Sequence, residues 1–266
     1  MTVPIALTIA GSDSSGGAGI QADLKTFSAL GVYGASVLTA LTAQNTREVR
    51  AILDVDPAFI RAQLETVLDD LRIDAIKIGM LSRPEVIDTV ASILAERVSC
   101  PVVLDPVMVA KSGDRLLQAE AVAALREQLV PLATLITPNL PEAADLLGVD
   151  EPTDEAAMHD VLHALGALGS TSVLLKGGHL AGAESPDLLL STGEVKRLVA
   201  PRHATSNTHG TGCTLSSAIA AGLAHGESIS DAVRAAKHYV SAAIAAADDL
   251  GVGSGHGPVH HFYAKW

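Results

Sequence analysis

The sequence predicts an α/β fold in which a mostly parallel sheet is covered by helices on both faces. Short apolar runs of strand length alternate with longer segments of helical periodicity along the chain of 266 residues. This alternation is typical of parallel sheets, whose strands are joined by crossover helices. Polar residues also gather behind the apolar runs, where ligands bind in such sheets. We expect a single domain over residues 1–266.

The first half of the chain begins with a short apolar run over residues 5–10, which predicts a buried strand. Residues 20–30 carry apolar side chains at helical spacing. Residues 32–42 are rich in β-branched and small side chains, which favours one strand over that span. The elements expected next are a short extra strand over 50–55, a helix from 57 to about 71, a strand over 75–78, a helix over 84–97 and a strand over 102–104.

The second half continues the alternation and then departs from it. The elements expected first are a helix over 117–129, a strand over 134–136, helices over 141–147 and 154–168, and a strand over 172–175. A turn over residues 192–194 contains Gly193, which predicts an antiparallel pair over 187–191 and 195–199. Two Ala-rich helices over 211–223 and 230–248 close the chain.

The composition excludes several classes of protein. Aromatic residues make up 3% of the chain and the net charge is −12, which disfavours nucleic acid and anionic membranes as partners. Cys100 and Cys213 lie far apart, so neither a disulfide framework nor a zinc motif is expected, and a reducing cytoplasm is the simplest location. We see neither a signal peptide nor an uninterrupted apolar run that would have to span a membrane.

Polar or glycine residues follow the predicted strands at the edge where ligands are expected. They are Asp13, Gln44, Gly79 with Met80, Asp105, Asn139 and Lys176.

The segment over residues 206–214 reads SNTHGTGCT and precedes an apolar helix. Its two glycines allow the chain to bend so that free N–H groups at the helix N-terminus point at one spot, which predicts an anion-binding site. Cys213 lies at the mouth of that site, where the helix field favours a thiolate. The alternative is an ordinary glycine turn with Cys213 as a small core residue.

Lys176 ends a predicted strand beside two glycines and could neutralise a phosphate, or could simply be a solvated lysine in a turn. Asn139 and Glu142 fit a helix cap, with Pro141 in the first turn. The same two side chains could instead hold a hydrated Mg²⁺.

Asp105 precedes a loop containing Lys111, which could be a basic lid over phosphates or an ordinary surface loop.

Two nucleotide-binding motifs are rejected. Gly17, Gly19 and Ala22 match the dinucleotide fingerprint by letter, but polar residues separate them from the strand and the next strand ends in Gln44 rather than an acid. A nicotinamide-dependent oxidoreductase is therefore not supported. A P-loop is absent, because neither Lys25-Thr26 nor Lys111-Ser112 follows a glycine.

Taken in order, these segments resemble the hydroxymethylpyrimidine/phosphomethylpyrimidine kinases of the ribokinase-like superfamily. The resemblance rests on residues 10–23 (AGSDSSGGAGIQAD), 31–34 (GVYG), 41–46 (LTAQNT), 77–81 (KIGML), 105–108 (DPVM), 137–142 (TPNLPE), 176–179 (KGGH) and 209–214 (HGTGCT). It implies a three-layer α/β/α fold with a small β lid, and a homodimer. It also implies ATP-dependent phosphorylation of 4-amino-5-hydroxymethyl-2-methylpyrimidine and of its monophosphate, in thiamine diphosphate biosynthesis.

The resemblance also implies roles for individual residues. Gln44 would read the pyrimidine edge, although a strand-end amide can also bond its own backbone. Asp23 would hold the hydroxymethyl group, with Gly11 beside it, and Met80 and Val107 would form apolar walls. The residues implied for ATP are Lys176, Asn139, Thr211 and Gly212. Those implied for Mg²⁺ are Glu142, with Asn139 or Asp105.

For the transfer step, the backbone of Gly210, Thr211 and Gly212 would stabilise charge on the phosphoryl group beside Lys176. Cys213 would take the hydroxyl proton, or would only form part of the anion-binding site. Two other functions stay open: a pyridoxal kinase activity on the same fold and a non-catalytic pyrimidine sensor.

Overall fold

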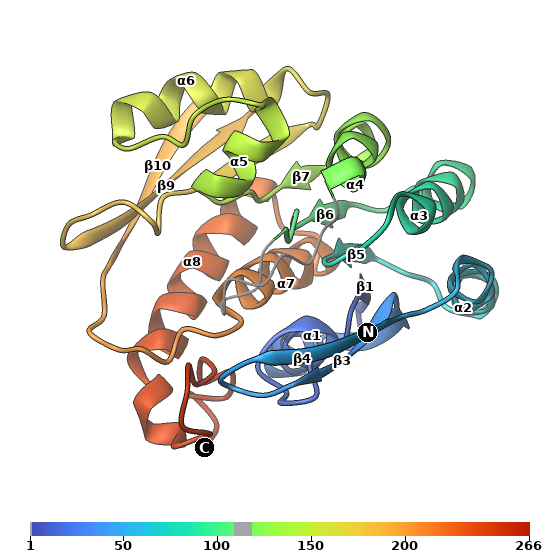
Figure 1. Ribbon diagram of the computed structural model, residues 1–266, viewed down its shortest axis with the longest axis horizontal. Helices are drawn as coiled ribbons and strands as arrows, with labels where there is room; N and C mark the ends of the chain where they lie inside the picture. Colours follow the sequence, from blue (N-terminus) through green and yellow to red (C-terminus); the bar gives the residue numbers. More distant parts are fainter. Residues whose placement is uncertain (1, 109–118) are drawn as a thin grey trace.

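The computed structural model describes residues 2–108 and 119–266 and confirms an α/β fold with a mostly parallel central sheet. Eight strands lie in the order β10-β9-β8-β7-β6-β5-β1-β2 (Figure 1). All neighbours from β2 to β8 are parallel, and β9 and β10 continue the sheet as antiparallel strands. The strands are β1 (Ile5–Ala10), β2 (Tyr33–Leu38), β5 (Ala75–Ile78), β6 (Val102–Leu104), β7 (Leu135–Ile136), β8 (Ser172–Lys176), β9 (Glu184–Ser191) and β10 (Glu194–Pro201).

Helices cover both faces of this sheet and create two separate apolar cores, which gives three layers. The helices are α1 (Gly19–Ala29), α2 (Pro57–Asp70), α3 (Pro84–Arg97), α4 (Ala119–Ala124), α5 (Leu140–Leu147), α6 (Glu155–Gly166), α7 (Thr211–Ala224) and α8 (Ile229–Ala245). One core holds residues of α2, α3, α5 and α6, and the other holds residues of α1, α7 and α8. Among the described residues, no helix is long and apolar enough to cross a membrane.

The strand expected over residues 32–42 is wrong, because the chain leaves the main sheet at Thr39. The N–H of Thr39 donates to the carbonyl of Ala10, and its buried hydroxyl donates to the carbonyl of Met80. Beyond it, β3 (Ala40–Gln44) pairs antiparallel with β4 (Val49–Asp54) as a separate two-stranded sheet. The expected extra strand is thus confirmed as β4, and Gln44 ends a hairpin strand rather than a strand of the main sheet.

The helix expected over residues 117–129 is only partly regular. Its start lies outside the described residues, α4 ends at Ala124, and a π-helical turn η1 (Leu125–Leu129) follows. The last helix also ends earlier than expected and is followed by a 3₁₀ turn, η3 (Ala247–Leu250). The antiparallel pair around Gly193 is confirmed, although both strands are longer than expected.

Candidate active site

Lys176, Asp105 and Glu142 meet at the carboxyl ends of the parallel strands. Lys176 ends β8, Asp105 follows β6, and Glu142 lies in the first turn of α5. The Nζ atom of Lys176 is 2.9 Å from Oδ1 of Asp105 and 3.9 Å from Oε2 of Glu142. Asp105 also accepts hydrogen bonds from Thr137 at 3.0 Å and Ser216 at 3.3 Å. The sheet therefore brings together three residues that are distant in sequence.

Burial and neighbouring charges shift these groups in different directions. Burial alone would raise the pKa of Asp105, but Lys176 and Lys77 hold it below its usual value. Burial dominates at Glu142 and raises its pKa to about 7, although Lys176 opposes the shift. Burial would lower the pKa of Lys176, yet the two carboxylates hold it above its usual range. Glu142 is thus the group whose charge is least well compensated.

The start of α7 lies directly against this charged cluster. Gly210 is the N-cap residue with φ of 77°, a left-handed conformation in which glycine is favoured, and a β-carbon there would collide with the carbonyl of Gly17. A β-carbon at Gly212 would lie 3.5 Å from both Asp105 Oδ2 and Lys176 Nζ. The first N–H groups of a helix have no intrahelical acceptor. The expected anion-binding turn therefore lies beside the expected phosphate lysine.

Cys213 lies partly exposed in the first turn of α7, but its chemistry differs from the expectation. The helix field alone predicts a thiol that ionises readily. In the structure burial dominates and raises the pKa of Cys213 to about 11, although the charge of Lys77 opposes the shift. The thiol is therefore uncharged at neutral pH in the resting protein. The expectation of a thiolate at this position is wrong for the protein without substrates.

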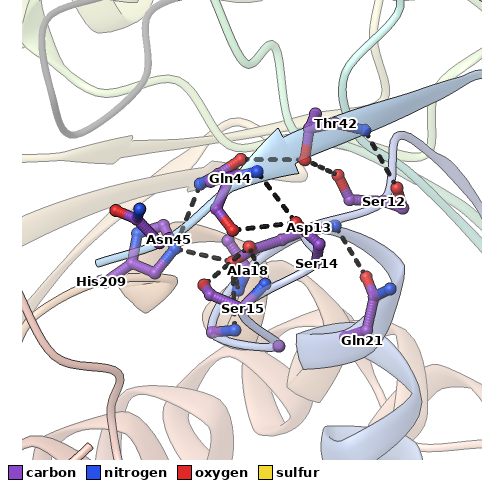
Figure 2. Close-up of polar contacts among 12 residues, drawn as sticks. Ser12, Asp13, Ser14, Ser15, Ala18, Gln21, Thr42, Gln44, Asn45 and His209 are labelled. Carbon is purple, nitrogen blue, oxygen red and sulfur yellow. Dashed lines mark hydrogen bonds and ion pairs between the residues drawn. The ribbon is translucent and has the colours of Figure 1, made fainter. Parts of the chain in front are cut away.

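Gln44 lies at the other side of the α7 turn, where the β3–β4 hairpin approaches it. Figure 2 shows its amide beside the ring of His209, with the two Nε2 atoms 3.4 Å apart. The main chain of Gln44 is held by Ser14, whose hydroxyl oxygen lies 2.8 Å from both the N–H and the carbonyl oxygen of Gln44. Because His209 directly precedes Gly210, the pyrimidine-reading candidate and the anion-binding turn are neighbours.

Sequence reasoning gave no role to Asp13 or His209, which form a buried pair behind Gln44. The Asp13 carboxylate accepts from His209 Nε2 at 2.8 Å, and from the backbone N–H groups of Ser15, Gly17 and Ala18 (Figure 2). Burial would raise the pKa of Asp13, but His209 and Ser15 hold it well below its usual value. The signal in the sequence was an acid at the start of a glycine loop, whose partner lies about 200 residues away.

The Asp23 side chain lies inside the protein, on α1. It is fully buried and accepts from Thr8 at 2.6 Å, from Ser217 at 2.6 Å and from Lys77 at 2.9 Å. The carboxylate thus has three partners inside the protein, and its contact with a hydroxymethyl group stays a prediction. Lys77 on β5 is equally buried, and sequence reasoning assigned it no role because it lies within an apolar strand.

The remaining expected substrate residues lie near the carboxyl ends of β1, β5 and β6. A β-carbon at Gly11 would lie 3.3 Å from the terminal methyl of Met80, so these two residues pack together. Val107 lies half-buried two residues after Asp105, and its N–H donates to the Asp105 carbonyl. The expected basic loop around Lys111 lies outside the described residues.

Asn139 forms the helix cap that the sequence allowed. Its side chain accepts from the N–H of Glu142 at 2.9 Å, and the Glu142 carboxylate accepts from the N–H of Asn139 at 2.8 Å. The described residues contain no cluster of three or more metal-ligating side chains. Asp105 and Glu142 still suit Mg²⁺, which needs only one or two carboxylates when phosphates and water complete its shell.

Comparisons with known proteins identify the family of the chain. Residues 13–260 match the model of the family described as phosphomethylpyrimidine kinase. The chain is 58% identical to the hydroxymethylpyrimidine/phosphomethylpyrimidine kinase of Rhizobium meliloti (strain 1021) and 54% identical to that of Escherichia coli (strain K12), covering 98% of each chain compared.

Solved structures show the same fold. The pyridoxal kinase of Bacillus subtilis, solved with ADP, superposes with a TM-score of 0.92 at 42% identity and 99% coverage of both chains. The phosphomethylpyrimidine kinase of Clostridium difficile 630 superposes with a TM-score of 0.81 at 46% identity, covering 91% of this chain and all of that one. The expected ribokinase-like fold is confirmed, and the chain belongs to the phosphomethylpyrimidine kinase family.

Proposed function

We propose that the protein transfers the γ-phosphoryl group of ATP to the hydroxyl of 4-amino-5-hydroxymethyl-2-methylpyrimidine, and then phosphorylates the monophosphate. In the first step a bond forms between the hydroxyl oxygen and the γ-phosphorus, and the bond from that phosphorus to the β-phosphate oxygen breaks so that ADP leaves. The hydroxyl proton passes to Cys213 as its thiolate, or to solvent water where Cys213 only forms part of the anion-binding site. The observation that carries the proposal is the short turn before α7, with Gln44 at one end and Lys176 at the other.

The residues around this turn suit phosphoryl transfer, in which positioning and charge stabilisation dominate. Lys176 would contact ATP phosphates. The N–H groups of Thr211 and Gly212 would face the transferred group, with the Thr211 N–H exchanging its 3.3 Å bond to the carbonyl of Thr208 for a phosphoryl oxygen. Asp105 and Glu142 would hold Mg²⁺, which when bound neutralises phosphate charge. Asn139 supports this pair through its cap rather than as a direct ligand, because its side-chain oxygen already accepts from Glu142.

The test is direct. The protein is incubated with the pyrimidine alcohol, ATP and Mg²⁺, and the products are followed by mass. We expect the monophosphate and then the diphosphate, each with one ADP formed per phosphoryl group transferred. Tight binding of the pyrimidine with no ADP formed would instead identify a sensor, and no binding of the pyrimidine would refute the proposal.

Pyridoxal is a second candidate substrate, favoured by one specific observation. The structure superposes more closely on the Bacillus subtilis pyridoxal kinase than on the Clostridium difficile phosphomethylpyrimidine kinase. The sequence favours the pyrimidine, because the 58% and 54% identical relatives carry the hydroxymethylpyrimidine kinase name. Specificity constants for the two alcohols decide between them, and a higher value for pyridoxal would reverse the assignment.

We also propose that two copies associate through the β3–β4 hairpin. Leu41 and Leu53 lie directly opposite each other on its two strands, and both are exposed. Directly opposite side chains on an antiparallel pair lie on the same face, so these two leucines form an apolar patch that water would otherwise cover.

The unpaired cysteines, Cys100 and Cys213, are consistent with the proposed reducing cytoplasm.

A further inference from the structure

The contact between Gln44 and His209 joins two nitrogens that can both be donors. Gln44 Nε2 is an amide NH₂ group, which only donates, and it lies 3.4 Å from His209 Nε2. The same histidine nitrogen lies 2.8 Å from Oδ2 of Asp13. An imidazole nitrogen either carries a hydrogen or offers a lone pair, so it cannot donate to Asp13 and accept from Gln44 at once.

The charge of Asp13 determines whether Nε2 of His209 donates a hydrogen bond or accepts one. Its carboxylate is almost fully buried and already accepts from the N–H groups of Ser15, Gly17 and Ala18, and from the Ser15 hydroxyl. A carboxylate that accepts this many hydrogen bonds is stabilised as the anion. An anion at 2.8 Å requires a hydrogen on His209 Nε2, and the lone pair that Gln44 Nε2 would need is therefore absent.

Thr42 presents the same conflict on the opposite side of the amide. Its hydroxyl lies 2.8 Å from the carbonyl of Ser12 and 3.3 Å from Oε1 of Gln44. The single hydroxyl hydrogen serves the shorter contact with the carbonyl. What Thr42 then offers Gln44 is a lone pair, which suits an NH₂ group and not an amide oxygen. Both neighbours therefore favour the opposite orientation of the amide (Figure 2).

We propose that Asp13 and His209 are positioning residues that fix the Gln44 amide with its oxygen toward His209 and its nitrogen toward Thr42. The oxygen and nitrogen of an amide are hard to tell apart by shape, so the hydrogen-bond network decides the orientation. His209 Nε2–H then contributes a second, weaker bond to Gln44 Oε1. Gln44 is half-buried, so part of the residue stays accessible to a ligand.

The consequence concerns specificity and rests on the proposed function. A 4-aminopyrimidine presents a donor, its exocyclic amine, next to an acceptor, its ring nitrogen. An amide held in one orientation matches that order with its oxygen on the His209 side and its nitrogen on the Thr42 side, and mismatches the reverse order. The phenolic hydroxyl of pyridoxal can donate or accept, so it depends less on the orientation of the amide. The Asp13–His209 pair therefore favours the aminopyrimidine.

The first test locates the hydrogen in the ligand-free protein by ¹⁵N NMR of histidine side chains, with His209→Phe used to assign the signals. We expect Nε2 of His209 to carry a hydrogen, whether or not Nδ1 also carries one. A His209 with its only hydrogen on Nδ1 would overturn the proposal, because His209 Nε2 could then accept a hydrogen bond from Gln44 Nε2. This result does not depend on whether the protein is a pyrimidine kinase.

The second test measures KM and kcat for the pyrimidine alcohol and for pyridoxal. The variants are His209→Phe, which lacks the N–H, and His209→Gln, whose NH₂ can donate to both Asp13 and Gln44. In His209→Phe we expect KM for the pyrimidine alcohol to rise about tenfold with kcat changed less than about threefold, the size expected for one lost hydrogen bond. KM for pyridoxal should change less, and His209→Gln should restore most of the difference.

Two outcomes of the kinetics would overturn the proposal. The first is a fall in kcat for both substrates with KM unchanged, which would mean that His209 only supports the turn before α7. The second is equal damage by the two variants, which would mean that the ring shape matters and the hydrogen does not. A wild-type protein that phosphorylates no pyrimidine alcohol would instead refute the proposed function, and the NMR result would still decide the orientation of Gln44.

Discussion

Glu142→Gln should remove a pH dependence of stability that the structure assigns to one buried carboxyl. Burial raises the pKa of Glu142 from 4.5 to about 7. A carboxyl whose pKa is raised by folding stabilises the folded protein while it is protonated. That stability is fully present below pH 4.5 and is lost as the pH rises to about 7. Glutamine keeps the capping box, since Glu and Gln both serve at that position.

The size of the effect follows from the two pKa values. At about 1.36 kcal/mol for each pKa unit, the whole interval corresponds to about 3 kcal/mol, most of which falls between pH 5 and pH 8. The free energy of unfolding in urea, measured at both pH values, should therefore fall by roughly 2–3 kcal/mol more in the wild type than in Glu142→Gln. Glu96→Gln, at an exposed glutamate of α3, is the matched control and should behave as the wild type. Parallel pH dependences of Glu142→Gln and the wild type would refute the reasoning.

Three further predictions follow from the same structure. Cys213→Ala should lower kcat by about 100-fold or more if Cys213 takes the hydroxyl proton, which requires bound substrates to convert the uncharged thiol to a thiolate first. Pyrimidine affinity should stay nearly intact, and near-normal turnover would remove that role. Lys77→Met should cost about 3–5 kcal/mol in urea unfolding because it leaves the buried Asp23 charge uncompensated, whereas Lys77→Met with Asp23→Leu should be far less damaging; equal losses would contradict this account. Leu53→Asp should convert a dimer to a monomer in light scattering without loss of fold, and an unchanged mass would exclude the β3–β4 hairpin as the interface.

The elements of the main sheet could be predicted because their patterns are local. Residues 75–78 and 102–104 are mostly apolar segments of strand length, and both strands have the expected bounds. The break between β2 and β3 could not be predicted, because small and β-branched residues continue through Thr39 without a turn signal. Thr39 makes the last ladder bond to Ala10, and its hydroxyl then bonds to the carbonyl of Met80, which is distant in sequence.

The candidate site divides in the same way. Lys176 was visible as a polar residue at a strand end, Glu142 as part of a predicted helix cap, and the glycine turn from its spacing. The state of Cys213 was not, because the helix field is a local effect and burial depends on the whole fold. The role of Lys77 could not be predicted either. The lysine lies within an apolar strand, and only the fold shows that it pairs with Asp23 on α1.

The start of α7 joins the two halves of the proposed reaction, and this sets a limit on how the site can work. His209 contacts the pyrimidine-reading side, Gly212 lies against Lys176 and Asp105, and only two residues separate them. Ser216 and Ser217, one turn further along α7, bond to Asp105 and Asp23. Because buried bonds hold this helix at both points, its first turn is fixed relative to the sheet. We therefore expect the hydroxyl to reach the phosphoryl group by movement of the β3–β4 hairpin or of the ligands rather than of this turn.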